Sequence, residues 1–333
     1  MTGQLSCPVP RGGGSGNAAS LPGDSAWLAD LLRHGLVRAS FIPPKPIRDL
    51  RELTRYRTSL VQERTAEVNR LHKVLETANL KLAAVATDVL GASGREILAA
   101  LLDGQEDPAA LADLAKGKLR KKLPALRQAL TGRVQPQHRL LIERILVHID
   151  FLDESLAQVW GEIERHLQPF AELVELLQTM PGVGPTTAAT IIAEIGVDMS
   201  AFASAKHLAS WAGVCPGNNE SGGVKRTAKI TPGNRWLKAV LGEAAWVLVR
   251  MRDNYLSAQY HRLARRRGKH KALVAVMHSI LVGAYHILRD RQPYRELGGD
   301  YFDRLDAARL ERYHVTRLKQ LGYEVTLTPK QVA

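Results

Sequence analysis

The chain has 333 residues, enough for two or three domains with hydrophobic cores of their own. Its 46 Lys plus Arg against 33 Asp plus Glu leave a net charge of +13 and a pI near 9.9, a balance that favours polyanionic partners. The two cysteines, Cys7 and Cys215, lie far apart, which excludes a disulfide framework and a cysteine-rich zinc site.

The N-terminal part begins with residues 1–23, which are rich in Gly and Pro, lack periodicity and are predicted to be disordered. They contain no signal peptide, so we expect a soluble intracellular protein. Asp24 is placed to cap a helix that runs to His34, with Gly35 after its end. The next helix is long and is expected over residues 47–86, with an apolar seam on one face. Its other face is basic and carries Arg48, Arg51, Arg55, Arg57, Arg64 and Arg70.

A second long helix is expected over residues 136–167, because its apolar positions alternate three and four apart in a heptad seam. These positions are Ile142, Ile145, Ile149, Leu152, Leu156, Val159 and Ile163. Short helices with breaks at Gly91, Gly94, Pro108 and Gly132 fill the region between the two long helices. The pattern predicts either an antiparallel hairpin with a helical insert or an oligomerising coiled coil.

A turn with two glycines, Gly182 and Gly184, is followed by Pro185, which suits the first position of a helix. That helix is expected to run to about residue 195, so that residues 173–196 form a helix-hairpin-helix. The exposed N–H groups at its start would bind a phosphate; the alternative is a tight connection between two packed helices. A dinucleotide-binding loop is disfavoured because Thr187 stands where a third glycine is needed, and a P-loop is excluded because Gly-Lys-Ser/Thr does not occur.

A polar glycine loop over residues 218–223 holds Ser221, and a basic segment with five Lys or Arg and no acid follows it to residue 242. A second run, residues 261–271, also lacks acids. A charge run is usually a solvated loop, but two of them in one region favour a surface that faces phosphates. The candidate nucleic-acid-binding residues are Gly182, Gly184, Lys225, Arg226, Lys229, Arg235, Arg265, Arg266 and Arg267.

The remaining C-terminal pattern is helical. One helix is expected to pack through Trp236, Val240, Ala244, Val247 and Met251, and residues 273–288 are expected to be the central core helix, too short to span a membrane. Residues 324–327 are the one expected strand. Trp211, Trp236 and Trp246 are expected in the core, with base stacking by Trp236 as an alternative. His278 and His286 are interpreted as satisfied core histidines rather than metal ligands.

The sequence therefore predicts a mainly α protein: a long helical hairpin or coiled coil, followed by a helical domain with a helix-hairpin-helix. We divide it into a disordered segment (1–23), a short N-terminal helical segment (24–45), the long-helix hairpin with its insert (46–170), a C-terminal domain with the serine loop (171–310) and a tail (311–333).

Residues 181–236, with Trp211, Ala212 and Gly213 and the glycine loop, resemble the C-terminal domain of the DEDD-type insertion-sequence transposases of the one-hundred-and-ten family, also described as bridge-RNA-guided recombinases. Residues 24–35 resemble the end of that family's N-terminal RuvC-like domain. The resemblance implies DNA transposition in a mobile element, with strands cut and rejoined by an acidic metal cluster and a serine. It also implies Mg²⁺, DNA and a structured guide RNA as partners, a homo-oligomer (a tetramer), and a cytoplasmic, nucleoid-associated location without a membrane.

Two residues match the family's site: Ser221 matches its serine, and Asp24 matches the second Asp of its Thr-Asp-x-x-Asp pair. Flanking glycines would let the Ser221 hydroxyl approach a phosphate as a nucleophile, whereas outside the family such a serine is most often a turn residue. Leu21 stands where the partner of Asp24 is expected, and the upstream segment is too short to supply a RuvC-like sheet with further carboxylates. Because one Asp cannot hold two Mg²⁺ ions, we expect that the sheet and most of the metal site are missing, through truncation or a misplaced start codon.

The leading hypothesis is a transposase or recombinase that cuts and rejoins DNA and binds its RNA along the basic helical hairpin; its cleavage activity is in doubt because Asp24 alone gives an incomplete metal site. The alternative is a non-catalytic nucleic-acid-binding remnant of such a transposase. A helix-hairpin-helix repair accessory protein is a third interpretation, which leaves the Ser221 loop unexplained.

Overall fold

A computed structural model describes residues 24–36, 42–216, 220–225, 229–305 and 307–327, and only the backbone at Asp24, Ser221, Lys225 and Leu310. The segment predicted to be disordered, residues 1–23, lies outside this description. The chain divides into two units, residues 1–42 and 43–333, each of which is described by itself. In the first unit, α1 covers Asp24–Arg33 and Gly35 follows it with a φ of +65°, as the capping pattern predicts.

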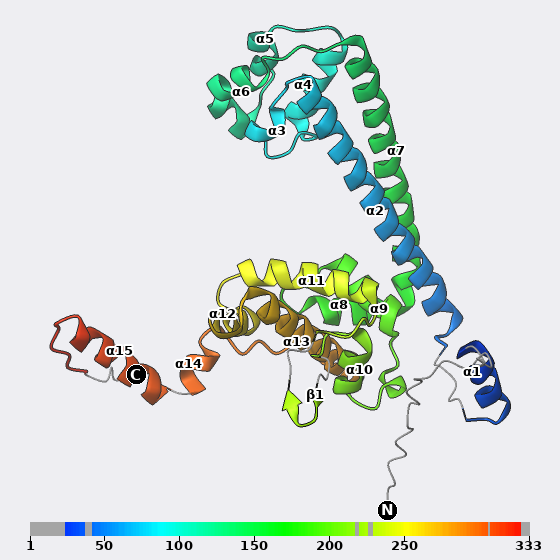
Figure 1. Ribbon diagram of the computed structural model, residues 1–333, viewed down its shortest axis with the longest axis vertical. Helices are drawn as coiled ribbons and strands as arrows, with labels where there is room; N and C mark the ends of the chain where they lie inside the picture. The colour runs from blue at the N-terminus through cyan, green and yellow to red at the C-terminus, as the bar shows by residue number, and fades with distance from the viewer. Residues whose placement is uncertain (1–23, 37–41, 217–219, 226–228, 306, 328–333) are drawn as a thin grey trace, which may run out of the picture. The chain divides into compact units, whose positions relative to one another are not determined.

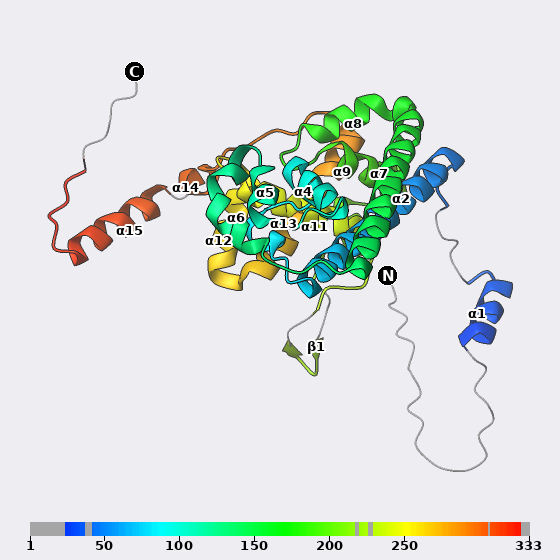
Figure 2. The ribbon, with the colours of Figure 1, turned by 90° about the horizontal axis from the view of Figure 1, so that it is seen from above.

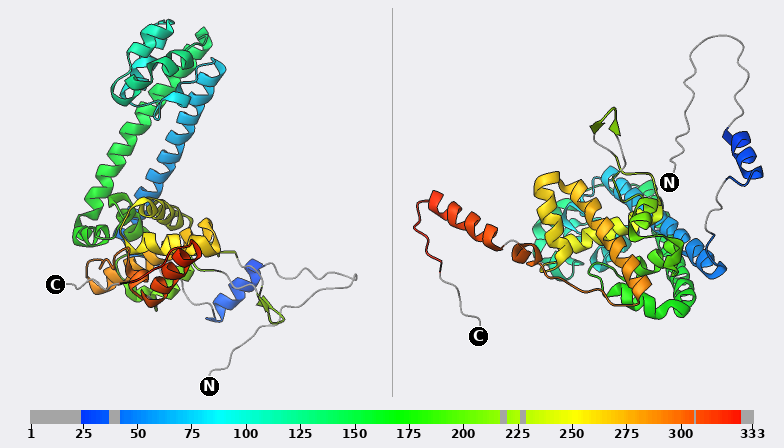
Figure 3. Two further views of the ribbon diagram at one scale, coloured as in Figure 1. Left: turned by 90° about the vertical axis from the view of Figure 1, so that its left-hand side faces the viewer. Right: turned by 90° about the horizontal axis from the view of Figure 1, so that it is seen from below.

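In the second unit, the two long helices α2 (Lys45–Thr77) and α7 (Pro136–Leu167) lie side by side (Figures 1 and 3). They are antiparallel, because Ile47 of α2 shares one buried cluster with Leu167 of α7, whereas Leu71 shares another with Ile142. The heptad seam of α7 is therefore filled by α2 of the same chain. Of the two arrangements that the sequence left open, the structure has the helical hairpin.

The predicted end of the first long helix at residue 86 is wrong, because α2 ends at Thr77. Asn79 adopts a left-handed φ of +59°, and the N–H of Leu80 turns back to the carbonyl of Leu75 at 2.8 Å. Ala78 and Leu80 are buried in the insert, so packing of the loop competes with helix continuation. The short α3 (Leu82–Val85) then begins the insert.

The insert between the long helices forms a small helical body with its own core. Its elements are α3, α4 (Ala92–Leu102), α5 (Pro108–Asp113), the 3-10 helix η1 (Gly117–Lys122) and α6 (Leu123–Ala129). Leu98, Leu111 and Leu126 are fully buried there against the hairpin residues Leu75 and Ile142. The predicted break at Gly94 is wrong: this glycine lies inside α4, where a Cβ would meet the carbonyl carbon of Val89 at 2.6 Å.

The C-terminal helical domain packs around α13 (Lys269–Asp290), which contacts α8, α10, α11 and α12. The domain's elements are η2 (Gln168–Phe170), α8 (Ala171–Gln178), α9 (Pro185–Ile195), η3 (Met199–Ala201), α10 (Ala205–Ala212), α11 (Arg235–Arg250) and α12 (Tyr255–Arg267). The predicted central core helix is thus present, although it is longer than expected. Within the described residues, α13 is the one helix whose length and apolar composition would suffice for a membrane span, and half of the span is buried in the domain.

The described residues contain two strands, β1 (Glu220–Ser221) and β2 (Val224–Lys225), which pair antiparallel as a small hairpin (Figure 2). The predicted strand at residues 324–327 is absent, because these residues are irregular and pair with no other described strand. They follow α14 (Tyr301–Leu305) and the longer α15 (Ala307–Gln320). The mainly α prediction is confirmed.

The predicted packing face of α11 is partly wrong. Val240 and Ala244 are buried, but Val247 is 55% exposed and Met251 lies beyond the helix and is 42% exposed. The buried stripe instead continues through Leu237, Leu241, Ala245 and Leu248, which face the other helices of the domain. Trp211 and Trp246 are also exposed by more than two fifths, so they are not core residues as expected.

Candidate nucleic-acid interface and serine hairpin

The two glycines in the turn between α8 and α9 have different roles. Gly182 has a φ of +79°, and a Cβ there would meet the carbonyl oxygen of Ala244 at 2.8 Å, so close packing on α11 requires glycine. Gly184 is exposed at the N-cap of α9, with open space where a Cβ would stand, and Pro185 begins the helix as predicted. Packing thus accounts for Gly182, and phosphate binding remains a prediction for Gly184.

The segment that carries the serine hairpin lies between two glycines, Gly213 before it and Gly233 after it, whose backbones pack against each other. Gly213 has a φ of +74°, and a Cβ on it would lie 2.9 Å from the Cα of Gly233 and 2.7 Å from the carbonyl oxygen of Thr231. A bridge between Pro216 and Ile230 follows this contact. We call this contact the glycine crossing. No side chain fits there, so the two ends of the segment that carries Ser221 are held together by backbone packing.

The hairpin places Ser221 beside its tight turn. The Cα atoms of Ser221 and Val224 are paired, and Gly222 and Gly223 between them have φ values of +58° and +75°. Two successive positive φ values are typical of a type I′ turn, which glycine adopts without strain. Val224 is 60% exposed, and Lys229 beyond the hairpin is exposed as well. Lys225 pairs with Glu220 in the strand register, whereas Arg226 lies outside the described residues.

Glu194, at the end of α9, is the most deeply buried carboxylate in the described part of the chain, with 1% exposure. Arg55 of α2 donates two hydrogen bonds to it, from Nε to Oε1 at 2.7 Å and from Nη2 to Oε2 at 2.8 Å. Arg51, one turn earlier, donates to the backbone carbonyls of Ala193 and Glu194, each at 2.9 Å. A charge buried to this degree is stable only when it is paired and hydrogen-bonded, as Glu194 is here.

Asn234 extends this network to the start of α11 and the end of the hairpin segment. Its Nδ2 donates to Glu194 Oε2 at 2.6 Å, and its Oδ1 accepts the N–H groups of Trp236 and Leu237, both at 3.0 Å. It therefore caps α11 directly after Gly233 of the glycine crossing. The hydrogen bond to Glu194 raises the pKa of Arg55, whereas burial lowers the pKa of Arg51.

The guanidinium groups of two arginines lie over the ring of Trp236. The Cζ of Arg235 lies 4.5 Å from the ring centroid, and that of Arg55 lies 5.7 Å away. Both distances are within the range of cation–π contacts. The ring is thus packed by the protein's own arginines, and base stacking by Trp236 remains a prediction.

The second basic run lies at the junction of two helices and is not the solvated loop that is usual for such a run. Arg265, Arg266 and Arg267 form the last turn of α12, and Gly268 separates them from α13 with a φ of +85°. All three are exposed and make no hydrogen bond or ion pair with another described residue. Cations in the last turn also interact favourably with the helix dipole, so their position alone does not require a ligand.

The histidines of α13 do not converge on a metal site. Burial lowers the pKa of His278, but His286 is exposed and lies 3.5 Å from Asp290, so the interpretation of His286 as a core histidine is wrong. Among the described residues, no group of three or more His, Cys, Asp or Glu side chains is placed to hold a metal ion. Asp24 contributes only its backbone to the description, so its predicted role as a ligand stays a prediction.

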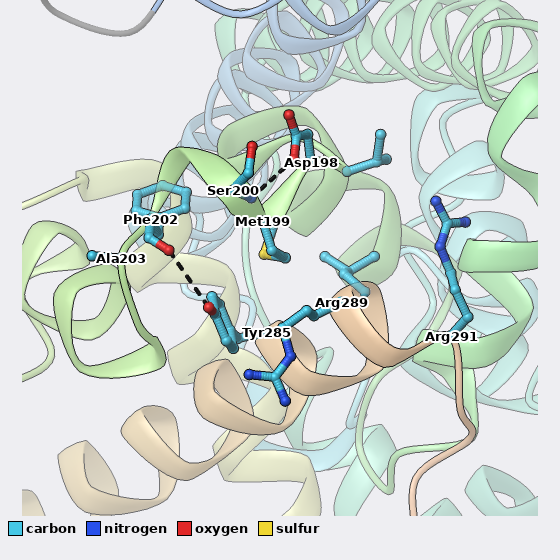
Figure 4. A pocket seen from close by; sticks show the side chains of 10 residues that line it. Asp198, Met199, Ser200, Phe202, Ala203, Tyr285, Arg289 and Arg291 are labelled. Carbon is cyan, nitrogen blue, oxygen red and sulfur yellow. Dashed lines mark hydrogen bonds between the residues drawn. The ribbon is translucent and has the colours of Figure 1, made fainter.

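A pocket of about 720 Å³ lies between η3 and the end of α13 (Figure 4). Tyr285, Arg289 and Arg291 line one side, and Asp198 and Ser200 line the other. Arg289 is paired with Asp290, and Asp198 accepts the N–H of Ser200 at 2.9 Å. None of the residues predicted from sequence lies in this pocket, so it is separate from the candidate interface.

Comparisons with known proteins match two segments of the chain. Residues 174–261 match a family model described as "Transposase IS116/IS110/IS902 family", and residues 22–80 match the DEDD transposase model of IS110 elements. Two segments of the chain thus match transposase domain models of the IS110 family. The matched segments include Asp24, Gly182, Gly184, Ser221 and Arg235 but end before Arg265.

Several curated proteins are similar to this chain. A Streptomyces coelicolor protein of insertion element IS110 is 28% identical over 83% of this chain and 72% of its own length. The transposase for IS1111A of Coxiella burnetii is 26% identical over 82% and 67%. The pilin gene-inverting protein of Moraxella bovis is 32% identical over 42% of this chain and 45% of its own length. The chain thus spans less than half of the pilin gene-inverting proteins that it matches.

Sequence reasoning missed Glu194 and the role of Asn234 in this chain. The available signal was a lone carboxylate in an otherwise apolar helix, since α9 contains no other charged residue. Such a residue needs a buried partner. The partners, Arg55 and Asn234, are 139 and 40 residues away in sequence, so only the tertiary structure identifies them.

Proposed function

We propose that this IS110-family chain cuts and rejoins DNA strands as a transposase or recombinase, with the Ser221 hydroxyl as the nucleophile. Attack forms an ester bond between Ser221 Oγ and the phosphorus and breaks one P–O bond of the DNA backbone. The hydroxyl proton of Ser221 leaves to a base, and the displaced oxygen takes up a proton and leaves as the free hydroxyl of the cut strand end. The phosphoserine conserves the phosphodiester for rejoining. The observation that carries the proposal is the hairpin, in which Ser221 lies beside a two-glycine turn on a segment held at the glycine crossing.

The proposed partners are DNA, a structured guide RNA and further copies of the chain in a tetramer. Two exposed cations that follow the serine hairpin, Lys229 and Arg235, support contacts to phosphates. Gly184 at the start of α9 would add backbone N–H donors. The similarity to a protein named for pilin gene inversion supports action on DNA.

Mg²⁺ is the proposed cofactor, and Asp24 is proposed as one of its ligands. The described residues do not fit a metal site, because they provide no cluster of three or more suitable side chains. One carboxylate is too few for the two-metal chemistry of phosphoryl transfer. The alternative proposal is a chain that binds nucleic acid without cleaving it.

The test uses the full chain with Mg²⁺, a supercoiled donor plasmid and its guide RNA, scored for nicking and for protein–DNA adducts. The enzyme proposal predicts adducts that disappear in Ser221→Ala and persist in the control Ser210→Ala, an exposed serine on α10. Binding without nicking or adducts would support the non-catalytic alternative. An adduct of normal yield in Ser221→Ala would remove Ser221 from the mechanism.

A further inference from the structure

The helical insert between α2 and α7 has a sharply uneven charge. Residues 82–113 hold six Asp or Glu and one Arg, whereas residues 114–142, which run on into the first two turns of α7, hold eight Lys or Arg and no acid. The 33 acids of the 333-residue chain correspond to about one in ten, so about three acids are expected in a segment of this length. The basic half of the insert is therefore distinct from the chain as a whole.

The 3-10 helix η1 has the highest density of Lys and Arg in this basic half, and its backbone is held by contacts with the rest of the insert. Leu119 packs against the insert core, and the backbone N–H of Lys116 donates to Ser93 Oγ at 2.8 Å. Lys122 Nζ donates to the carbonyl of Val85 at 3.1 Å, and Lys116 pairs with Glu96. These contacts tie both ends of η1 to α3 and α4.

Three cations of η1, Lys118, Arg120 and Lys121, are exposed and make no hydrogen bond or ion pair with any other described residue. We call these three the basic platform. Because a 3-10 helix has three residues per turn, Lys118 and Lys121 lie on one face, about 6 Å apart along the axis. Lys118 and Lys121 therefore form a row of positive charge, with Arg120 on a neighbouring face of η1, and the fold itself does not use these charges.

The arginines of the long helix α2 differ from the platform in this respect. Four of the six that were expected to form its basic face contact other parts of the chain, and a fifth, Arg70, pairs within α2 itself. Arg51 and Arg55 bind at Glu194, Arg57 lies over Trp160, Arg64 pairs with Asp153, and Arg70 pairs with Glu67. Their charge is already partnered, so a polyanion gains less from them than from the platform.

We propose that the basic platform binds the sugar–phosphate backbone of a nucleic acid. Lys and Arg side chains are the usual partners of backbone phosphates. A membrane surface would require exposed apolar side chains beside the cations, and the one apolar residue of η1, Leu119, packs toward the core instead. The chemistry of the platform thus fits phosphodiester ligands, either DNA or RNA.

This inference does not depend on strand cleavage. The platform adjoins the end of α2 near Leu75, and the helix rises about 30 Å between Arg55 at the Glu194 network and Leu75. The platform would therefore hold a part of the nucleic acid that is remote from Ser221. Loss of platform binding and loss of cleavage are then separate outcomes.

The first experiment is lysine footprinting of the full chain. Acetylation of Lys118 and Lys121 is measured by mass spectrometry without ligand, with duplex DNA, with a hairpin RNA and with polyglutamate. The proposal expects protection of both lysines by at least one nucleic acid but not by polyglutamate, and the two nucleic-acid arms show which of them is bound. Unchanged reactivity, or equal protection by polyglutamate, would overturn it.

The second experiment compares two triple variants with equal loss of charge. Lys118→Gln, Arg120→Gln and Lys121→Gln together should weaken duplex binding and reduce the slope of log K against log salt by up to about 2.7, at about 0.9 for each lost contact. The control combines Arg312→Gln, Arg317→Gln and Lys319→Gln on α15 and should change binding less. An equal loss in both triples would overturn the proposal.

Discussion

Arg55 and Glu194 form a two-point ion pair between the base of the helical hairpin and the C-terminal domain, with N–O distances of 2.7 and 2.8 Å. The Glu194 side chain is fully buried, whereas that of Arg55 is 38% exposed. Asn234 binds the same carboxylate and caps α11. The hairpin helix, the end of α9 and the segment that returns from Ser221 therefore meet at one carboxylate.

We expect Glu194→Ala to destabilise the protein by about 3 kcal/mol, at the lower end of the range for breaking a buried ion pair, because Arg55 keeps some contact with water. The control is Asp113→Ala, which removes an exposed pair with Arg127 and should cost at most about 1 kcal/mol. Urea unfolding measures both changes. Equal costs in the two variants would show that the Glu194 network does not hold the domains together.

At the glycine crossing, we expect an added methyl group to destabilise the protein more than it does at a glycine with open space around it. Gly233 has a φ of +52°, and a Cβ there would lie 2.5 Å from the Cα of Gly213, so Gly233→Ala combines backbone strain with a clash between backbones. We expect a loss of more than about 2 kcal/mol. Gly117→Ala has a similar φ of +56° but open space around the Cβ, and should cost about 1 kcal/mol. Thermal unfolding measures the loss of stability in each of the two variants. Equal losses would mean that backbone strain alone, and not the clash with Gly213, destabilises Gly233→Ala.

The last turn of α12 predicts a change in salt dependence. If Arg265, Arg266 and Arg267 contact phosphates, replacing all three by Gln should weaken binding to different DNA sequences by similar factors. The slope of log K against log salt should fall by up to about 0.9 for each lost contact. Fluorescence anisotropy titrations at several salt concentrations measure this slope. An unchanged slope would mean that the three arginines are only a solvated helix end.

Tyr294 predicts a loss of stability in alkali. Burial, reinforced by the charge of Glu296, raises its pKa to about 12. In the unfolded chain the phenol ionises near its ordinary pKa of about 10, so between these values the unfolded state loses its proton first. The free energy of unfolding should therefore fall as the pH rises from about 10 to about 12. In Tyr294→Phe this part of the decrease should disappear from urea unfolding curves; an identical pH profile would contradict the assignment.

The sequence by itself determined the helical class, the length of α7 and the turn before α9. Heptad spacing sets which face of α7 is apolar, and Pro185 after Gly184 sets where α9 begins; both are local effects of helix geometry. The glycines of residues 218–223, by contrast, predicted only a polar loop, and the structure shows the paired strands β1 and β2 there, with positive φ values at Gly222 and Gly223.

Only the tertiary structure decided where α2 ends, which face of α11 is buried and which cations are already paired. The end of α2 depends on burial of Ala78 and Leu80 in an insert core whose other members come from later helices. The burial of Glu194 depends on Arg55 and Asn234, which the chain brings together from three distant helices. Helical periodicity contains no information about such long-range partners, because each of these contacts depends on how separate elements pack.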